Sequence, residues 1–152
     1  MKLSTKGRYG LRAMVDLAIN ATDQKVTIKS ISERQGISEN YLERIIALLK
    51  KAGYVTSSRG AQGGYRLSAE PSDITVGNIL RALEGDLNPV DCTLTNDDKE
   101  CSQKNLCVTK FVWKRISDSI NEAVDGISLQ DMVNEQLDIQ NKYGAMEEKV
   151  NG

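Results

Sequence analysis

The sequence predicts a mainly α-helical fold with a small β-hairpin wing: a winged helix-turn-helix followed by a long dimerisation helix. Three observations lead to this prediction. Two amphipathic helical patterns are separated by a tight turn, a glycine-rich hairpin pattern follows them, and a long apolar stripe with helical period appears later in the chain. We divide the chain into a winged helix over 1–70, a sensor loop with dimerisation helices over 71–137, and a flexible tail over 138–152.

The first three helices are indicated by their caps and by their apolar spacing. Residues 5–20 place apolar side chains at mostly helical intervals, so a helix is expected there. Thr27 can cap a second helix, IKSISERQ, which stops at Gly36. Ser38 can cap a third, ENYLERIIALLKKA. Two helices joined by a turn of about three residues containing glycine are typical of a helix-turn-helix. The apolar face of the third helix comprises Tyr41, Leu42, Ile45, Ile46, Leu48 and Leu49.

A hairpin pattern follows the third helix directly. Residues 54–56 and 65–67 favour strands, and between them RGAQGG forms a glycine-rich turn that carries Arg59. Glycines let a loop approach a phosphate backbone closely, and an arginine there can pair with phosphates or enter a minor groove. A hairpin after a helix-turn-helix predicts a winged helix. In this basic part of the chain, DNA contact is favoured over an ordinary surface hairpin.

The two parts of the chain differ in charge. Residues 1–70 carry 12 Lys+Arg and 6 Asp+Glu, a net charge of +6, whereas residues 71–152 carry 8 and 15, a net charge of −7. This asymmetry suggests that the N-terminal part binds a polyanion and that the C-terminal part has another role. Charged residues on helix surfaces can also be distributed in this way by chance. No apolar run approaches the roughly 18 residues that span a bilayer, and the first residues lack the apolar stretch of a signal peptide. We expect a cytoplasmic protein with no membrane partner.

The C-terminal part is predicted to hold helices on both sides of a polar loop. A fourth helix, ITVGNILRALEG, covers 74–85, and helical spacing resumes from Asn105 to Asp125. The second of these carries the only Trp and the only Phe of the chain. A monomer of this size has little core left to cover such a stripe, so we expect the helix to join a homodimer. Ser128 is expected to cap a short helix, LQDMVNEQL, before a polar tail that frays. The stripe comprises Leu106, Phe111, Val112, Trp113, Ile116, Ile120, Ala123 and Val124.

All three cysteines, Cys92, Cys101 and Cys107, lie in one polar, acidic loop, DCTLTNDDKECSQKNLC, in a chain without histidine. An odd number of thiols in a reducing compartment argues against a disulfide framework and leaves metal binding, redox chemistry or catalysis. The gaps of eight and five residues differ from the CxxC of zinc ribbons and thioredoxin-like sites. Thiolates on a flexible loop can wrap an iron–sulfur cluster. Three free, partly buried thiols without a ligand are the alternative.

Five stretches of the chain together resemble one family. They are KLSTKGRYGLRAMVDLA, ISERQGISENYLERI, SSRGAQGGYRLS, ITVGNILRALEG and ISLQDMV. They look like the bacterial winged-helix transcription regulators of the iron–sulfur-cluster regulator (IscR) type, from Met1 to about residue 135. The relatives of that family include nitric-oxide sensors and a cysteine-metabolism repressor. The resemblance implies a cytoplasmic homodimer on pseudo-palindromic, double-stranded operator DNA. It also implies an iron–sulfur cluster, of the 2Fe-2S type, held by Cys92, Cys101 and Cys107.

The chain departs from the family pattern at the fourth cluster ligand. In the cluster regulators a histidine follows the last cysteine by three residues, and this position is Lys110 here, whose protonated amine has no lone pair. Asp91, Glu100, another oxygen donor, an exogenous thiol or a group of the partner subunit could replace it. The nitric-oxide sensors use an acidic residue near position 8 of the partner subunit, where this chain has Arg8. The first cysteine gap is also longer than in the cluster regulators, so the cluster type stays open.

The residues expected to contact DNA lie in the third helix, in the wing and near the start of the chain. In a recognition helix that begins at Ser38, the first two turns usually meet base edges. Glu43 is expected to act on sequence choice, because a carboxylate accepts from cytosine N4 but repels phosphates. Arg59 and the wing are expected to govern affinity. The full set is Lys6, Ser38, Glu39, Asn40, Tyr41, Glu43, Arg44, Arg59, Gly60, Gly63, Gly64 and Tyr65.

These features favour a DNA-binding transcription regulator, either a repressor or an activator, that senses an iron–sulfur cluster or redox status through the three-cysteine loop. Cluster binding would close the loop, fix the start of the long helix and change the spacing of the two winged helices. The alternative is a metal-free regulator controlled by thiol oxidation or by a partner enzyme of cysteine metabolism. An enzyme is disfavoured, because without histidine general acid–base chemistry would rest on carboxylates alone. The target genes and the physiological signal are not determined by the sequence.

Overall fold

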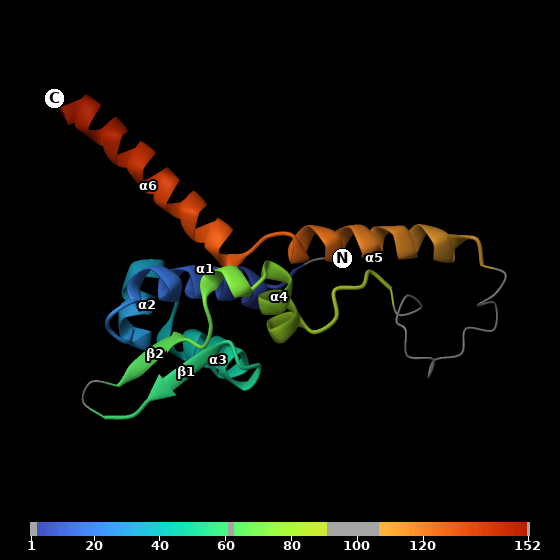
Figure 1. Cartoon of the computed structure of the whole chain (residues 1–152), viewed down its shortest axis with the longest axis horizontal. Helices are drawn as coiled ribbons and strands as arrows, with labels where there is room; N and C mark the ends of the chain where they lie inside the picture. Colours follow the sequence, from blue (N-terminus) through green and yellow to red (C-terminus); the bar gives the residue numbers. More distant parts are fainter. Residues whose placement is uncertain (1–2, 61–62, 91–106, 152) are drawn as a thin grey trace.

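The structure, a computed structural model, describes residues 3–60, 63–90 and 107–151. In Figure 1 the helices α1 to α4 and the hairpin form one body, from which α5 and α6 extend in different directions. This arrangement confirms the predicted mainly α-helical fold with a β-hairpin wing. The elements are α1 (Thr5–Asn20), α2 (Ile28–Gln35), α3 (Glu39–Lys51), β1 (Val55–Ser58), β2 (Gly64–Leu67), the 3-10 helix η1 (Pro71–Asp73), α4 (Val76–Glu84), α5 (Thr109–Asp125) and α6 (Leu129–Asn151).

The helix-turn-helix has the predicted local structure. The Thr27 hydroxyl accepts a hydrogen bond from the Ser30 backbone N–H at 3.1 Å, which caps α2. Gly36 ends α2 with φ at 65°, in the left-handed region that residues with a Cβ rarely adopt. The Ser38 hydroxyl then accepts from the Tyr41 N–H at 3.3 Å and caps α3. The turn between α2 and α3 is therefore specified by short-range contacts.

The hydrophobic core is organised around α1. Gly10 of α1 faces α4 so closely that a Cβ at this position would lie 2.0 Å from the Leu83 Cδ1 atom. The two helices can therefore approach only because Gly10 has no side chain. The buried apolar faces of α2 and α3 pack against the same core, as does the start of α6. The largest fully buried side chains are Met14, Leu17, Ile31, Leu42, Ile45, Ile46, Leu49, Val55, Ile74, Ile79 and Leu129.

The wing is a two-stranded antiparallel hairpin in which Val55 pairs with Leu67 and Ser58 with Gly64. The segment before α2 is joined to it, because Val26 and Tyr65 exchange two backbone hydrogen bonds of 3.0 and 2.8 Å. This bridge ties β2 to the helix-turn-helix. The wing is thus oriented relative to α2 by backbone hydrogen bonds.

The C-terminal elements confirm part of the prediction. The long helix begins at Thr109, later than predicted, since Cys107 and Val108 are described and are not helical. The predicted first residue, Asn105, lies outside the described residues. The predicted Ser128 cap is present, since the Ser128 hydroxyl accepts from the Asp131 N–H at 3.0 Å. In the ranges that the structure describes, no helix has the length and apolar character required to span a bilayer.

The predicted end of the last helix is wrong. The sequence indicated a short helix that stops near residue 137, whereas α6 continues to Asn151. The polarity of the segment after 137 predicts a tail, but the segment contains no proline and consists mostly of residues that are compatible with a helix. Polarity therefore indicated exposure at these positions, and not loss of helical structure.

Candidate nucleic-acid interface and cysteine site

The helix α3 presents a polar face to solvent. Its apolar side chains are buried in the core, which leaves Glu39, Asn40, Glu43 and Arg44 exposed on the opposite side. Tyr41 differs from these predicted DNA contacts, because it is half-buried. The Tyr41 and Tyr9 rings meet edge to face, with centroids 5.6 Å apart. The core thus positions α3 with this polar face exposed, and its contact with DNA stays a prediction.

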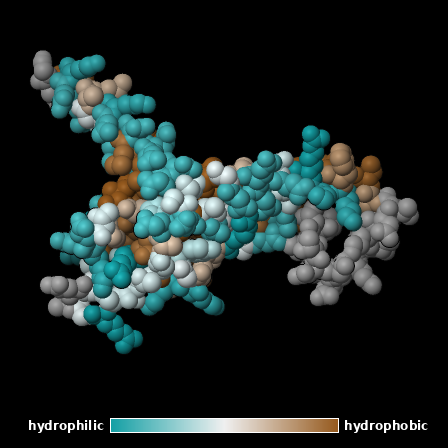
Figure 2. All heavy atoms as spheres, viewed as in Figure 1, coloured by the Kyte–Doolittle hydropathy of each residue, from teal (hydrophilic) through white to brown (hydrophobic). Residues whose placement is uncertain are grey.

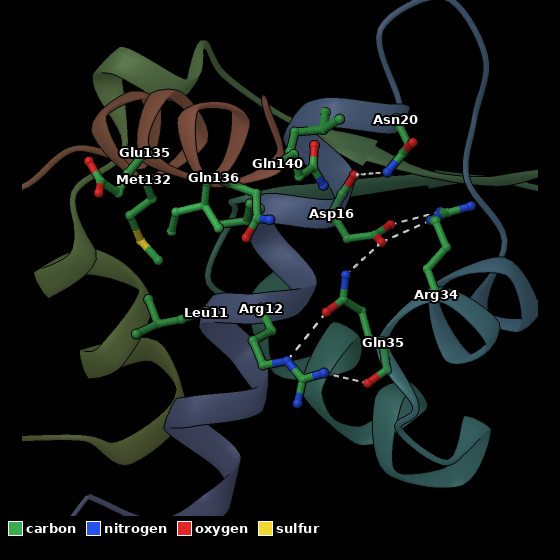
Figure 3. Close-up of a pocket in the computed structure, with 13 residues that line it drawn as sticks. Leu11, Arg12, Asp16, Asn20, Arg34, Gln35, Met132, Glu135, Gln136 and Gln140 are labelled. Atoms are coloured by element: carbon green, nitrogen blue, oxygen red, sulfur yellow. Dashed lines mark hydrogen bonds and ion pairs between the residues drawn. The ribbon is translucent and has the colours of Figure 1, made fainter. Parts of the chain in front are cut away.

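A buried ion pair fixes the helix-turn-helix on α1 (Figure 3). The Asp16 carboxylate, whose side chain is 1% exposed, accepts from Arg34 Nε at 2.9 Å and from Arg34 Nη2 at 2.7 Å. It also accepts from Gln35 Nε2 at 3.0 Å. The hydrogen bond to Asp16 raises the pKa of Arg34 above its ordinary value. Arg12 completes the network by donating to the Gln35 side-chain and backbone oxygens.

This network holds α2 in a defined orientation on α1, and α3 follows α2 after one short turn. Sequence analysis missed it. A carboxylate four residues before Asn20 and an arginine at the end of α2 look like ordinary helix-surface charges until the two helices are packed together. No short-range pattern in the sequence identifies their contact.

The wing carries basic side chains around a shallow groove. The groove has a volume of about 510 Å³ and is lined by residues of the wing, of the start of α2 and of the end of α3, among them Thr27, Lys50, Arg59 and Gly63. Arg59 is exposed at the turn, and Lys25 donates a hydrogen bond to the Ser58 hydroxyl beside it. Three cationic side chains thus lie where the wing meets the helix-turn-helix, which is an arrangement suited to phosphate groups.

The wing turn requires glycine at two positions. Gly60 has φ at 110°, and a Cβ at Gly63 would lie 2.5 Å from the Ser58 carbonyl oxygen. Gly64 and Tyr65 belong to β2, where Tyr65 is half-buried beside Val26. The glycines therefore have a structural role in shaping the wing, and their predicted contact with DNA stays a prediction.

The start of α1 is held by α4. The Glu84 carboxylate accepts from the Ser4 and Gly7 backbone N–H groups at 3.1 and 2.9 Å. It thereby satisfies amide groups that have no partner within the helix, and its negative charge complements the helix dipole. Lys6 lies in this first turn, partly exposed. The structure thus gives Lys6 a fixed backbone, while its contact with DNA stays a prediction.

Cys107 is the described member of the predicted cysteine site, and Cys92 and Cys101 lie outside the described residues. The Cys107 Sγ atom is 3.0 Å from the Thr109 hydroxyl. This hydrogen bond, followed by those from the Lys110 and Thr109 backbone N–H groups, lowers the pKa of Cys107. Lys110 adds a favourable positive charge. The environment thus favours the thiolate, which is the form that binds iron or reacts with oxidants.

The rest of the predicted metal site is not tested by the described ranges, within which no group of three or more potential ligand side chains is found. Cys107 fits an iron–sulfur cluster by its donor chemistry, since it is a partly exposed thiol with a lowered pKa just before α5. Lys110 lies at the start of α5, and its charge stabilises the neighbouring thiolate. A lysine ammonium group has no lone pair, so this position does not offer the ligand that a histidine would.

The apolar stripe on α5 divides into two parts. Phe111, Val112 and Ile116 are 66%, 44% and 39% exposed. By contrast, Ile120 and Val124 pack against the buried cluster of Val76, Leu80 and Leu87. Figure 2 shows apolar surface near the outer end of α5. The body of the molecule therefore covers Ile120 and Val124 of the predicted dimer stripe, whereas Phe111, Val112 and Ile116 nearer its N-terminal end are exposed.

Known proteins of similar sequence share this architecture. The family model for Rrf2, described as an iron-dependent transcriptional regulator, matches residues 3–135. The regulator IscR of Aliivibrio salmonicida is 42% identical over 88% of this chain and 77% of the relative. A solved structure of T. potens IscR is 48% identical, with a TM-score of 0.72 and coverage of 90% and 88% of the two chains.

A second branch of the family is similar to the same degree. A solved structure described as CymR, the global cysteine regulator of B. subtilis, is 40% identical, with a TM-score of 0.71. The match covers 89% of this chain and 98% of that one. These relatives are named as transcription regulators, and the predicted resemblance is confirmed. The chain belongs to the Rrf2 family of winged-helix transcription regulators.

Proposed function

We propose that the chain regulates transcription as a homodimer that binds operator DNA through α3 and the wing and senses a signal through its three cysteines. The observation that supports DNA contact best is the exposed polar face of α3 beside a groove lined by Lys50 and Arg59. The exposed side chains of α3 reach base edges in a major groove, and the wing reaches the adjacent backbone or minor groove.

The wing proposal is tested with Arg59→Ala and with Arg66→Ala as a matched control. Arg66 is an exposed arginine of the same hairpin, but it lies on β2 and away from the wing turn. At fixed salt, Arg59→Ala should weaken operator binding by about 1–3 kcal/mol if it makes a groove contact, whereas Arg66→Ala should have a smaller effect. If the two variants bind the operator with equal affinity, Arg59 does not contribute to the DNA interface.

We also propose that the exposed part of the α5 stripe forms the dimer interface. Phe111, Val112 and Ile116 face solvent on one side of the helix, and a shallow groove of about 390 Å³ lies beside them. Operator sites for winged-helix dimers are two-fold symmetric, and a self-complementary patch is what such symmetry needs. These three side chains are the large apolar residues of α5 that the described part of the chain leaves exposed.

For the signal, we propose an iron–sulfur cluster held by Cys92, Cys101 and Cys107. When bound, the cluster would supply a group whose presence and redox state depend on iron and oxidants. The residues of the chain would supply thiolates, and the hydrogen bond with the Thr109 hydroxyl lowers the pKa of Cys107, which favours that form. Because α5 begins two residues after Cys107, closure of the cysteine segment would act on the start of the proposed dimer helix.

A metal-free regulator is the second candidate. The lowered pKa of Cys107 suits thiol oxidation as well as metal binding, and a structure described as a global cysteine regulator is 40% identical to this chain. An absorption spectrum of protein purified without oxygen separates the candidates. Visible bands that dithionite bleaches, and that are lost when all three cysteines are replaced by alanine, support the cluster. A colourless protein whose operator binding responds to oxidants supports the metal-free reading.

The regulatory role itself is tested by comparing cluster-loaded and cluster-free protein on one panel of operator sequences. A coupling of about 1–3 kcal/mol would change affinity roughly 5–150-fold. Identical binding curves across the panel would mean that the cysteine segment is no switch, even if it binds iron.

A further inference from the structure

The C-terminal part of α6 extends beyond the body of the molecule. The first turns of α6 lie on the core, where Leu129 and Val133 are 0% and 8% exposed. Ile139 and Gln140 of α6 and Ile19 at the end of α1 line one groove, so the support from α1 ends at this level. From residue 141 every described side chain of α6 is exposed, and Figure 1 shows this part projecting from the body. We refer to residues 141–151 as the overhang.

The overhang carries a regular apolar seam. Ile139, Tyr143, Met146 and Val150 follow one another at steps of four, three and four residues and are 54%, 64%, 66% and 84% exposed. This spacing is the heptad pattern of a coiled coil. It continues the line of Leu129 and Met132, which pack on the body, and Gln136 is the one polar residue on that line. The first part of the seam therefore packs on the core, whereas its second part is exposed to solvent.

The composition of the overhang does not explain a helix without support. Gly144 lies in its middle, and glycine costs about 1 kcal/mol relative to alanine in a helix interior. Short helices in water are marginal even with favourable residues, and most helices in proteins depend on the packing of an apolar face. The seam of the overhang is such a face, and no described residue of the same chain packs on it. A partner on this seam would stabilise the helix.

The charges beside the seam identify the partner. Lys142 and Lys149 flank it on one side, and Glu147 flanks it on the other. In a parallel pair of identical helices, each Lys142 faces Glu147 of the second copy, which gives two attractive contacts. In an antiparallel pair the lysine flanks face each other and repel. We propose that the overhangs of two copies of this chain pair as a short, parallel coiled coil.

This surface is separate from the proposed dimer interface. The overhang and the outer end of α5 lie at opposite ends of the molecule in Figure 1. A two-fold axis along the α6 seam therefore cannot be the axis that relates two α5 helices. The overhang pair would join two α5-linked dimers, and two such isologous contacts per chain generate tetramers or longer assemblies. The family match ends at residue 135, so the overhang lies outside the range matched by the family model.

Sedimentation of the full chain tests the proposal with Met146→Glu and the matched control Ala145→Glu. Both variants add one carboxylate to the overhang, but Ala145 lies beside the seam and is exposed on the outer face. Wild type and Ala145→Glu should reach at least twice the mass of Met146→Glu at high protein concentration. Equal masses for all three at every concentration would overturn the proposal.

The orientation is tested by thiol cross-linking. With Val150→Cys, mild oxidation should give a homodisulfide between the two thiols at position 150, identified by peptide mass, because a parallel pair brings the same seam position of two copies together. Ala145→Cys should cross-link at least tenfold less. Equal cross-linking of both variants, or none at position 150, would overturn the parallel pair.

The outcome is independent of the proposed α5 dimer. In an Ile116→Asp background, which should break the α5 interface, the overhang alone should still give a dimer. Adding Met146→Glu to that background should give a monomer. If Ile116→Asp alone is already monomeric at high concentration, the overhang pair is refuted while the α5 dimer is supported. If Ile116→Asp leaves the wild-type mass unchanged, the α5 interface fails without affecting the test of the seam.

Discussion

Replacing Arg34 with alanine should destabilise the fold by about 3 kcal/mol, because it would leave the Asp16 carboxylate buried without its charged partner. Asp16 is 1% exposed and accepts hydrogen bonds of 2.9 and 2.7 Å from Arg34. After the change, the single remaining side-chain donor would be Gln35 at 3.0 Å. The exposed control Arg44→Ala should change stability by less than about 0.5 kcal/mol.

The magnitude follows from the burial of the two partners. Removing one member of a buried ion pair costs about 3–5 kcal/mol, since the other charge stays buried. The Arg34 side chain is 39% exposed, so water can enter the vacated space and the lower end applies. The reverse change, Asp16→Ala, should cost less, about 1.5–3 kcal/mol, because the freed guanidinium can turn to solvent. The two single variants are thus predicted to be unequal, with Arg34→Ala the more harmful.

Urea unfolding followed by circular dichroism measures both effects, at one protomer concentration because association shifts apparent stability. With a slope of about 1–3 kcal/mol per M urea, a loss of 3 kcal/mol moves the midpoint down by roughly 1–3 M. A double variant completes the cycle and should be about as stable as Asp16→Ala alone, since no buried charge then remains. Equal losses for the two single variants, or a loss below about 1 kcal/mol for Arg34→Ala, would refute the role assigned to the buried pair.

Three further predictions concern the DNA interface, the dimer surface and an exposed ion pair. Glu43→Ala should change the ranking of operator sequences in a binding assay, because the exposed carboxylate can accept from cytosine N4 but repels phosphates; an unchanged ranking would make it a surface charge. Ile116→Asp should lower the sedimenting mass and reduce operator binding, whereas Ile116→Leu should do neither; a mass unaffected by the aspartate places the interface elsewhere. Arg81 lowers the pKa of Asp125 through two hydrogen bonds of 2.8 Å. The free energy that this pair contributes to folding is therefore fully present at a pH above 3.8, the ordinary pKa of an aspartate. It is lost as the pH falls through the lowered pKa of Asp125. Both side chains are more than a third exposed, so it is worth at most about 1 kcal/mol. Asp125→Asn should be less stable than wild type near neutral pH and should converge with it in acid; a constant difference in acid unfolding curves would contradict this.

The sequence by itself determined the elements whose signals are short-range. Thr27, Gly36 and Ser38 act on backbone groups within about one turn, so the helix-turn-helix could be located from their order along the chain. The hairpin was predicted for the same reason, because turn residues and β-formers are adjacent in sequence. The grouping of all three cysteines in one segment also needed no structure to be recognised.

Only the tertiary structure decided which surface charges and apolar residues have partners. In the sequence, nothing distinguishes Asp16 and Arg34 from the many charged residues that lie exposed on helices. Their contact arises because α1 and α2 pack side by side. The apolar period of α5 is continuous, yet Ile120 is covered by α4 whereas Ile116 is left exposed. Periodicity shows that one face of a helix is apolar, but burial depends on which element lies against each turn. The length of α6 is a similar case, since helix propensity permits a helix after residue 137 and polarity does not end it.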